Sequence, residues 1–298
     1  MSHGHRNHSS AAAATVASHY NARPQVGIDA RQESSILQLK NLHNWIKSVL
    51  IRRFARRGDS VLDFCCGKGG DLQKWIKADI SNLIGADIAN VSVQHAIERC
   101  RERNPRFNAK FYTMDCFVEP VESIVQPSSI DLVSCQFALH YCAENEQKFD
   151  RALDNIALAL RPGGHFIATI PNCYRLIKKL EASPSLSFGN TKYNVRFETK
   201  DHPSIFGHKY WFQLEDAIDD CPEYVFHFPT FVRKAAERGL ELVYEKPFHD
   251  LFNEEVMDAE NRSLIYKMRV LDEQGTISAD EWEVSGIYMA VALKKRKT

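Results

Sequence analysis

The sequence lacks several features that mark common classes of protein. Its eight cysteines include no Cys-x-x-Cys pair, which argues against a zinc module. No apolar stretch approaches the length of a membrane span, and the alanine run at 11–14 has neither the length nor the flanks of a secretory signal. Positive charge is not in excess either, because 38 Lys and Arg balance 38 Asp and Glu. We therefore predict an intracellular protein with reduced cysteines, which must bind any anionic ligand through a local basic patch.

The composition is that of an ordinary globular protein. The chain has 298 residues, of which 44% are hydrophobic and 26% are charged, and this length suits one large α/β domain or two small ones. Residues 1–17 are rich in His, Ser and Ala without apolar periodicity, which predicts a disordered tail. The histidines His3, His5 and His8 could hold a metal ion, but a flexible tail is the preferred interpretation. A folded domain is expected over 18–298.

The central motif of the chain is the stretch 63–71, DFCCGKGGD. It follows the apolar run 60–62 and precedes a helical pattern that starts at Leu72, so a strand, a small-residue loop and a helix occur in direct succession. Backbone N–H groups of such a loop and of the helix start can face a ligand. The next strand ends on an acid, Asp87, about twenty residues further on, where a βαβ nucleotide site places a ribose ligand. Together these features favour nucleoside binding over a purely structural turn.

Strand and helix patterns then alternate, which predicts βαβ units and a parallel sheet covered on both faces. Strands are expected at 60–64, 83–88, 109–114, 130–137 and 164–170, and helices at 34–54, 91–103 and 148–160. Ligands of such sheets lie beyond the carboxyl ends of the strands. Asp63, Asp87, Asp115 and the segment 136–141 fall at these ends, so we expect them to converge on one rim.

The alternation breaks after Pro171. The stretch at about 183–230 is rich in aromatics, and its short alternating runs predict a small antiparallel insertion over the rim. Further elements are expected as helices at 172–181 and 231–238 and strands at 240–244 and 287–293. The basic residues at 294–297 are either a targeting signal or a solvated terminus.

Two nucleoside ligands suit this pattern, a dinucleotide and S-adenosylmethionine. The dinucleotide fingerprint requires G-x-G-x-x-G, whereas this loop has Cys65, Gly67 and Gly70, so its first glycine is missing. Asp115, at the end of the third strand, suits an adenine amino group better than a pyrophosphate. The loop therefore favours S-adenosylmethionine.

Several motifs resemble the eukaryotic mRNA cap guanine-N7 methyltransferases. They are DFCCGKGGD, GADIANVSV, SCQFALHY, RPGGHFIATIPN and WEVSGIYMAV, together with LHNWIKSVL and PEYVFHF. The resemblance covers residues 18–293 and implies an α/β fold of the class I methyltransferase (Rossmann-like) type. That fold has a mostly parallel sheet with an antiparallel last strand, helices on both faces and a small antiparallel insertion over the active site.

The resemblance also implies an activity. The methyl group of S-adenosylmethionine would pass to N7 of the guanine in the GpppN cap of mRNA, leaving S-adenosylhomocysteine, and no metal is expected. A nuclear location and contact with the capping machinery or RNA polymerase are further expectations from the same resemblance.

Carried over position by position, the resemblance implies two sets of ligands. The methyl donor would be held by Lys47, Asp63, Cys65, Gly67, Asp87, Asp115, Gln136 and Tyr141. The cap would be held by His43, Asn44, Lys68, Lys74, Arg99, Phe137, His140, Pro171, Tyr210, Glu223 and Tyr288. Within these sets, Asp87 would take the ribose hydroxyls and Asp115 the adenine, and the cap triphosphate would meet Lys68, Lys74 and Arg99. These roles replace the solvated helix face that spacing alone suggests for His43, Asn44 and Lys47.

The implied chemistry needs no catalytic residue of the covalent or acid–base kind. Guanine N7 has an in-plane lone pair at neutral pH, so the protein has to hold nucleophile, methyl carbon and sulfur in line. His140 is therefore expected to shape the base pocket. Glu223 is the expected specificity residue, because a carboxylate can accept from the N1–H and the exocyclic amine of guanine. Two alternatives stay open: a methyltransferase for another acceptor, and a non-enzymatic RNA-binding or scaffold protein.

Cys65 departs from the family pattern, which has glycine at this position. The loop backbone is expected to approach the donor most closely here. A negative φ with the thiol turned away would preserve donor binding, whereas a positive φ with the thiol in the site would lower donor affinity.

Overall fold

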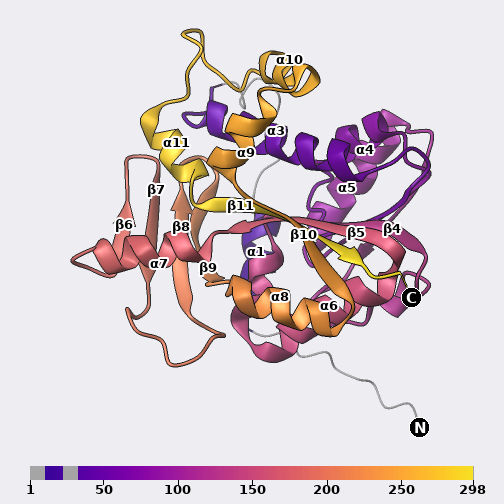
Figure 1. The fold of residues 1–298 in the computed structure, drawn as a ribbon, viewed down its shortest axis with the longest axis horizontal. Helices are drawn as coiled ribbons and strands as arrows, with labels where there is room; N and C mark the ends of the chain where they lie inside the picture. Colours follow the sequence, from indigo (N-terminus) through magenta and orange to yellow (C-terminus); the bar gives the residue numbers. More distant parts are fainter. Residues whose placement is uncertain (1–10, 23–32, 298) are drawn as a thin grey trace.

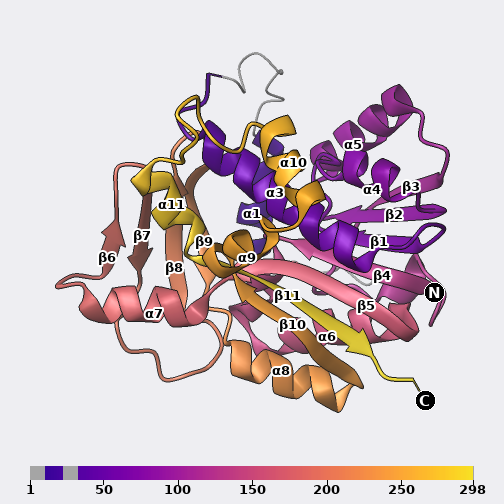
Figure 2. The same cartoon turned by 45° about the horizontal axis from the view of Figure 1, so that its top comes forward.

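A computed structural model describes residues 11–22 and 33–297, and its larger sheet carries the predicted rim (Figures 1 and 2). This sheet has seven strands in the order β10-β11-β5-β4-β1-β2-β3. Neighbours from β5 to β3 pair in parallel, whereas β11 is antiparallel to both β5 and β10. The strands are β1 (Ser60–Phe64), β2 (Asn82–Asp87), β3 (Asn108–Thr113), β4 (Ile130–Gln136), β5 (Leu160–Pro171), β10 (Leu240–Pro247) and β11 (Tyr288–Lys295). The predicted mostly parallel sheet with an antiparallel last strand is confirmed.

Helices cover both faces of this sheet, as predicted. Figures 1 and 2 place α3, α4 and α5 on one face and α6 and α8 on the other. The apolar residues of α3 recur at helical spacing and pack inward, so that Leu42, Trp45 and Ile46 are at most 1% exposed. The five helices are α3 (Leu37–Phe54), α4 (Leu72–Ala78), α5 (Asn90–Arg103), α6 (Glu146–Ala159) and α8 (Phe228–Glu237).

The predicted insertion forms a second, antiparallel sheet. Its strands pair in sequence order and are β6 (Ser187–Gly189), β7 (Tyr193–Phe197), β8 (Lys209–Leu214) and β9 (Ile218–Tyr224). Phe197, Tyr210 and Phe212 are at most 2% exposed and give this sheet its own aromatic core, and α7 (Cys173–Ala182) packs against β6. The short helix η2 (Leu139–Glu144) follows β4 and contacts β9. The insertion therefore lies against the carboxyl end of β4, where the predicted rim ends.

The helix α1 (Ala11–Ala22) corrects the prediction of a disordered tail for residues 11–17. Alanine has the highest helix propensity, and Val16 is buried against the rest of the protein. The Asn21 side chain also donates to Asn90 Oδ1 at 3.0 Å and accepts from the Val91 N–H at 3.1 Å, which fastens α1 to the start of α5. His3, His5 and His8 lie outside the described residues.

Three helices between β10 and β11 were not predicted from the sequence. They are α9 (Phe248–Glu255), α10 (Ala259–Lys267) and α11 (Ala279–Ser285), and a single turn, η1 (Val121–Ser123), precedes β4. Long-range packing stabilises them: the rings of His249 in α9 and Trp282 in α11 stack with centroids 4.0 Å apart. Such short helices depend on tertiary contacts more than on propensity.

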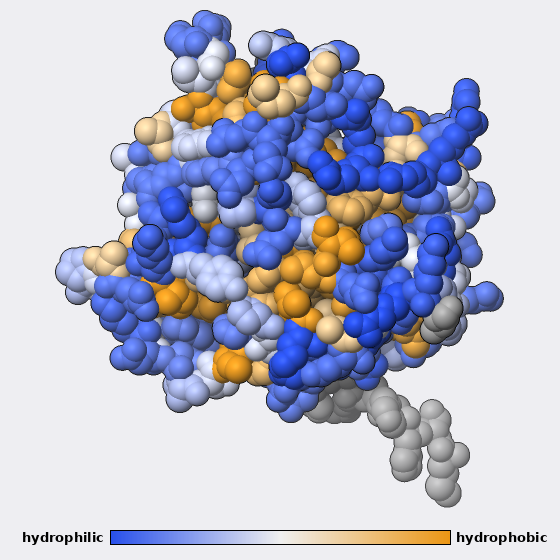
Figure 3. Space-filling view, viewed as in Figure 1, coloured by the Kyte–Doolittle hydropathy of each residue, from blue (hydrophilic) through white to orange (hydrophobic). Residues whose placement is uncertain are grey.

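The outer surface of the molecule is mainly hydrophilic in the view of Figure 3, with hydrophobic side chains gathered near the centre of the view. Val243 of the edge strand β10 is one of the exposed hydrophobic residues, at 46%. Among the helices in the described ranges, none is both long and apolar enough to cross a membrane.

Candidate active site

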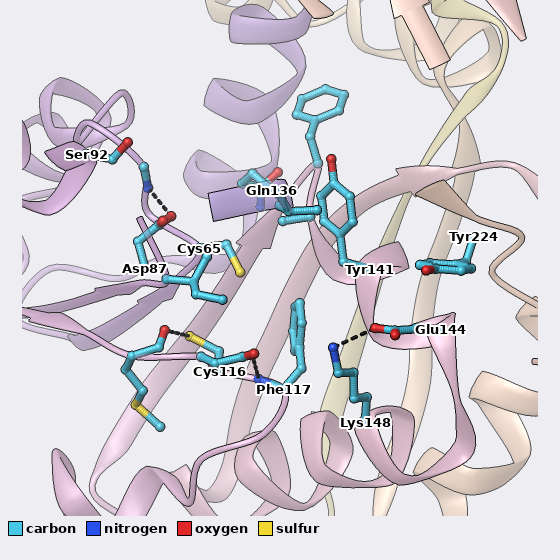
Figure 4. Close-up of a pocket in the computed structure, with 17 residues that line it drawn as sticks. Cys65, Asp87, Ser92, Cys116, Phe117, Gln136, Tyr141, Glu144, Lys148 and Tyr224 are labelled. Carbon is cyan, nitrogen blue, oxygen red and sulfur yellow. Dashed lines mark hydrogen bonds and ion pairs between the residues drawn. The ribbon is translucent and has the colours of Figure 1, made fainter. Parts of the chain in front are cut away.

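A cavity of about 240 Å³ lies at the carboxyl ends of β1, β2 and β4 (Figure 4). We call it the strand-end pocket. Six of the eight residues predicted to hold the methyl donor line it: Cys65, Gly67, Asp87, Asp115, Gln136 and Tyr141. The topology explains this convergence, because parallel neighbours end at the same edge of the sheet. In Figure 4, Gln136 and Tyr141 lie together at one end, while Asp87 and Cys65 face the cavity from the β1–β2 side.

The loop after β1 is fastened to the end of β2 through Asp87. The Asp87 carboxylate accepts hydrogen bonds from the N–H groups of Gly67 and Ala89, each at 2.8 Å. Burial raises the pKa of Asp87, and these two hydrogen bonds oppose the shift. Gly67 has φ +53°, a conformation that favours glycine. Asp87 therefore lies at the cavity wall, and its carboxylate has lone pairs that can accept hydrogen bonds from two hydroxyl groups.

The acid after β3 is held in the same manner. Asp115 Oδ1 accepts from the N–H of Phe117 at 3.0 Å, and burial raises the pKa of Asp115. Met114 and Phe117 line the same cavity as Asp115 and form apolar walls. Apolar walls of this kind can contact the face of a flat aromatic ring, and the carboxylate beside them can accept from an amino group at the ring's edge.

Cys65 adopts the positive φ that is expected to lower the affinity for the methyl donor. Its φ is +55°, in the left-handed region, and the residue lines the pocket. Its thiol lies within hydrogen-bonding reach of Cys116 and Cys135. The Cys116 thiol lowers the pKa of Cys65, but Cys135 and burial outweigh it and raise that pKa well above its usual range. A protonated, strained cysteine therefore occupies the position where the family pattern has glycine.

Two predicted donor ligands, Lys47 and Asp63, do not line the strand-end pocket. Lys47 Nζ lies 2.7 Å from Asp71 Oδ1 and joins α3 to the start of α4, while Asp63 accepts from the indole N–H of Trp75 at 3.3 Å. Burial, and then the negative charge of Asp71, raise the pKa of Asp63 to about 7. Burial acts to raise the pKa of Asp71 as well, but Lys47 and Lys74 outweigh it and hold that pKa low. The donor role of Lys47 and Asp63 stays a prediction.

A second cavity of about 180 Å³ lies between α3, η2, β9 and the start of β11. We call it the histidine pocket. Five residues of the predicted cap set line it: His43, Phe137, His140, Glu223 and Tyr288. Phe137 lines both cavities, so the two pockets are adjacent. Burial, assisted by Lys47, lowers the pKa of His43 to about 3, and this imidazole is therefore neutral at physiological pH.

The histidine pocket contains buried nitrogens without hydrogen-bond partners among the described residues. They are Nε2 of His43 and both ring nitrogens of His140. His140 Nε2 lies 3.3 Å from Glu223 Oε1, without the alignment of a hydrogen bond. The other carboxylate oxygen of Glu223 accepts from the Tyr210 hydroxyl at 2.7 Å. Because buried polar groups are normally satisfied, this cluster indicates a place for a polar ligand.

Aromatic rings form the walls of the same pocket. The Phe137 ring lies 4.8 Å from that of His43 and 5.2 Å from that of Tyr288, measured between centroids. Tyr288 pairs with Pro171 across β11 and β5, so Pro171 lies next to the pocket although it does not line it. Such walls suit a planar base.

Tyr210, on β8, lies outside both pockets and contacts Glu223, while the remaining predicted cap residues lie on α3, α4 and α5 or in the loop before α4: Asn44, Lys68, Lys74 and Arg99. Lys74 Nζ donates to Asn44 Oδ1 at 3.0 Å and to Asp71 Oδ1 at 2.7 Å. The loop that carries Lys68 packs on α5, where a Cβ added to Gly69 would lie 3.4 Å from Ala96, three residues before Arg99. The segments that carry these cations are therefore in contact: α4 with α3, and the loop before α4 with α5.

Several residues of the strand-end pocket were missed in the sequence analysis. They are Val16, Ile88, Ser92, Met114, Cys116, Phe117, Glu144, Lys148 and Tyr224. Phe117 and Ser92 follow the two strand-end acids closely, so the sequence offered a signal for them. No signal pointed to Val16, which lies in the segment predicted to be disordered. Figure 4 shows Lys148 and Glu144 paired at the cavity wall, with Nζ 2.6 Å from Oε2.

Solved structures with a similar arrangement of elements define the fold class of this chain. The CcbJ methyltransferase of Streptomyces caelestis superposes with a TM-score of 0.56 at 12% identity, covering 95% of this chain and 96% of its own. A putative S-adenosylmethionine-dependent methyltransferase from Listeria monocytogenes gives a TM-score of 0.53 at 14% identity over 87% of this chain and 99% of its own. The fold is therefore that of the class I S-adenosylmethionine-dependent methyltransferases.

Sequence comparison then gives the family. The model of the mRNA (guanine-N(7))-methyltransferase domain matches residues 3–296, so the chain belongs to that family. Curated mRNA cap guanine-N(7) methyltransferases are similar to it: 44% identical in Cryptococcus neoformans var. neoformans serotype D and in Schizosaccharomyces pombe, over 94% of this chain in both cases. The matched region is 47% of the Cryptococcus protein and 82% of the Schizosaccharomyces protein. Within the described residues, no three His, Cys, Asp or Glu side chains are grouped so as to hold a metal ion.

Proposed function

We propose that this chain transfers the methyl group of S-adenosylmethionine to N7 of the guanine in the GpppN cap of mRNA. The observation that carries the proposal is the pair of adjacent pockets that share Phe137. One has acids placed for a ribose and an adenine, and the other has a carboxylate and imidazole nitrogens that find no hydrogen-bond partner in the described part of the chain, between aromatic walls. Family membership supports the same pairing of ligands.

The strand-end pocket would hold the methyl donor. Asp87 accepts the ribose hydroxyls, Asp115 accepts from the adenine amino group, and Gln136 and Tyr141 close the end nearest Phe137. S-adenosylmethionine supplies a methyl group on a positively charged sulfur that leaves readily. The protein's part is to orient this group toward the second pocket and to keep water away from it.

The histidine pocket would hold the cap guanine. Glu223, fixed by Tyr210, accepts from N1–H and the exocyclic amine, and adenine cannot reproduce this pair. His43 and His140 then have a polar partner in the base, while Tyr288 and Phe137 contact its faces or edges. No side chain has to remove a proton, because N7 already carries a lone pair. His43 is neutral and contributes no charge.

Location and partners follow as parts of the same proposal. A cap-methylating protein would act on nascent transcripts in the nucleus, in contact with the capping machinery or RNA polymerase. One domain over 18–298, with the insertion at about 183–230, would carry the activity. These points are supported by the family resemblance.

Methyl transfer to defined caps tests the proposal. The purified chain, given S-adenosylmethionine, is expected to methylate GpppN-capped RNA at guanine N7 and to leave ApppN-capped RNA unmodified. Equal transfer to both caps would overturn guanine recognition. Binding of S-adenosylhomocysteine without transfer to either cap would point to another acceptor, and absence of that binding would favour a non-enzymatic RNA-binding protein.

A further inference from the structure

We propose that the edge of the large sheet formed by α5 and β3 binds the RNA that follows the cap, an inference that rests on the proposed function. The surface is called the basic edge and consists of Arg101, Arg103, Arg106 and Lys110, all exposed. β3 is the last strand of the sheet, and Figure 2 shows it with α5 beside α4, at the opposite end of the sheet from β10. The ligand of the basic edge would be the single-stranded RNA, a polyanion, that is attached to the cap.

A continuous series of contacts leads from the histidine pocket to this edge. His43 lines the pocket, and its neighbour on α3, Asn44, accepts from Lys74 of α4. The loop before α4 packs against Ala96 of α5 through Gly69. Arg103 lies two turns beyond Ala96 and four residues after Arg99, on the same side of the helix. A strand that leaves the pocket past the predicted triphosphate ligands therefore reaches the basic edge.

The charge of this segment differs from that of the whole chain. Residues 97–112 contain five cations, Arg99 and the four of the basic edge, against two acids, Glu98 and Glu102. The chain as a whole is balanced at 38 of each sign. Among the described residues, none of the four basic-edge side chains has an ion-pair or hydrogen-bond partner. Exposed cations of this kind gain most from phosphate groups, whose counterions they displace.

The basic edge also contains a groove with aromatic side chains in its wall. This groove has a volume of about 380 Å³ and runs between α5 and β3, with Arg101 and Lys110 at its rim and the half-buried aromatics Phe111 and Tyr112 in its wall. Cations that follow a backbone, with aromatic side chains on which bases stack, are the usual design for binding single strands without sequence preference. An added strand from another protein is disfavoured here, since an exposed lysine on an edge strand opposes strand pairing.

Salt-dependent binding of a fluorescent, capped, single-stranded RNA tests this inference. The variant Arg103→Ala/Lys110→Ala removes two phosphate contacts, so the slope of log affinity against log salt is expected to become shallower by about 1.4. The matched control is Arg175→Ala/Lys178→Ala, which removes an exposed arginine and lysine from α7, and its slope should equal that of the unmodified chain. Equal slopes for all three proteins would overturn the inference.

Methylation of two substrates separates this inference from the proposed function. The basic-edge variant should raise KM for the capped RNA and leave KM for the dinucleotide GpppG unchanged. Absence of GpppG methylation by the unmodified chain would reject the proposed function, while the salt slopes would still report on the basic edge. If the basic-edge variant keeps both its salt slope and its KM for capped RNA, the RNA inference is overturned and a protein becomes the candidate ligand of this edge.

Discussion

The two pockets differ in where their parts come from and in how complete they are. In the strand-end pocket, Asp87 and Asp115 each accept from an N–H group two residues further along the chain, at Ala89 and Phe117. The histidine pocket draws His43, His140, Glu223 and Tyr288 from four separate elements, and its imidazole nitrogens lack partners among the described residues. The first pocket is organised by its own backbone, whereas the second needs its ligand to complete its hydrogen bonds.

This difference has a consequence for binding. A site whose acids are already held by backbone groups is expected to bind its ligand without further ordering. A site with unsatisfied buried nitrogens has a desolvation cost that a matching base would remove. We therefore expect the proposed donor to bind in the absence of the cap, and specificity to reside in the histidine pocket.

The largest expected effect is that of substituting Glu223, which should impair the histidine pocket and leave the strand-end pocket intact. Glu223→Ala removes a buried charged acceptor and is expected to cost about 2–5 kcal/mol, seen as a fall in kcat/KM for capped RNA. Calorimetry should show unchanged affinity for S-adenosylhomocysteine. Tyr210→Phe is the matched control: it removes one hydrogen bond to the same carboxylate, keeps the carboxylate in place, and should cost about 1.5 kcal/mol. Near-normal turnover in Glu223→Ala would reject this specificity role.

The complementary change in the strand-end pocket is Asp87→Ala. It removes the proposed ribose ligand and leaves the N–H groups of Gly67 and Ala89 without their acceptor. Loss of the two charge-assisted hydrogen bonds from the proposed ribose hydroxyls should lower donor affinity about a hundredfold. Calorimetry with S-adenosylhomocysteine measures this affinity. Circular dichroism should show the fold retained. Unchanged affinity would contradict the ribose assignment and remove the contrast between the two pockets.

Acid pH should destabilise the protein through the histidine pocket. The pKa of His43 is about 3 in the folded protein, against 6.5 for an ordinary histidine such as that of the unfolded chain. Below pH 6.5 the unfolded chain therefore binds a proton that the folded chain does not. Stability is therefore lost as pH falls, by about 2 kcal/mol between about pH 7 and pH 5. Denaturant unfolding of His43→Asn should show a pH dependence reduced by that amount. Identical curves for both proteins would mean that His43 becomes protonated without unfolding.

The smallest expected effect concerns Cys65. Cys65→Gly relieves about 1 kcal/mol of left-handed strain, which the greater freedom of glycine in the unfolded chain largely offsets. Stability should change little, while removal of the thiol from the cavity should raise affinity for S-adenosylhomocysteine a few-fold. The neighbouring change Cys66→Gly, outside the cavity, is the control and should bring no gain. Equal or lower affinity in Cys65→Gly would show that the thiol does not hinder the donor.

The sequence predicted the strand-end pocket better than the histidine pocket. Asp87 and Asp115 could be placed because parallel strands end at one edge, a rule that needs only the strand pattern. Spacing alone predicted a solvated helix face for His43, Asn44 and Lys47, and only the family resemblance assigned them to the site. Of the three, His43 lines the histidine pocket. Val16 was missed because a short alanine-rich helix gives no sign of what it packs against. The helices α9 to α11 were missed for a related reason, since they depend on partners far along the chain.

By itself, the sequence determined the alternation of strands and helices from residue 34 to 170, the loop at 63–71 and the acids at the strand ends. These features depend on periodicity and on residues close together in the chain. Only the tertiary structure decided which side chains share a cavity, that Cys65 adopts a positive φ, and that Lys47 and Asp63 lie outside the strand-end pocket. The physical reason is that the histidine pocket joins α3 to β9 and β11, and such contacts depend on packing across the whole fold, which local propensity does not encode.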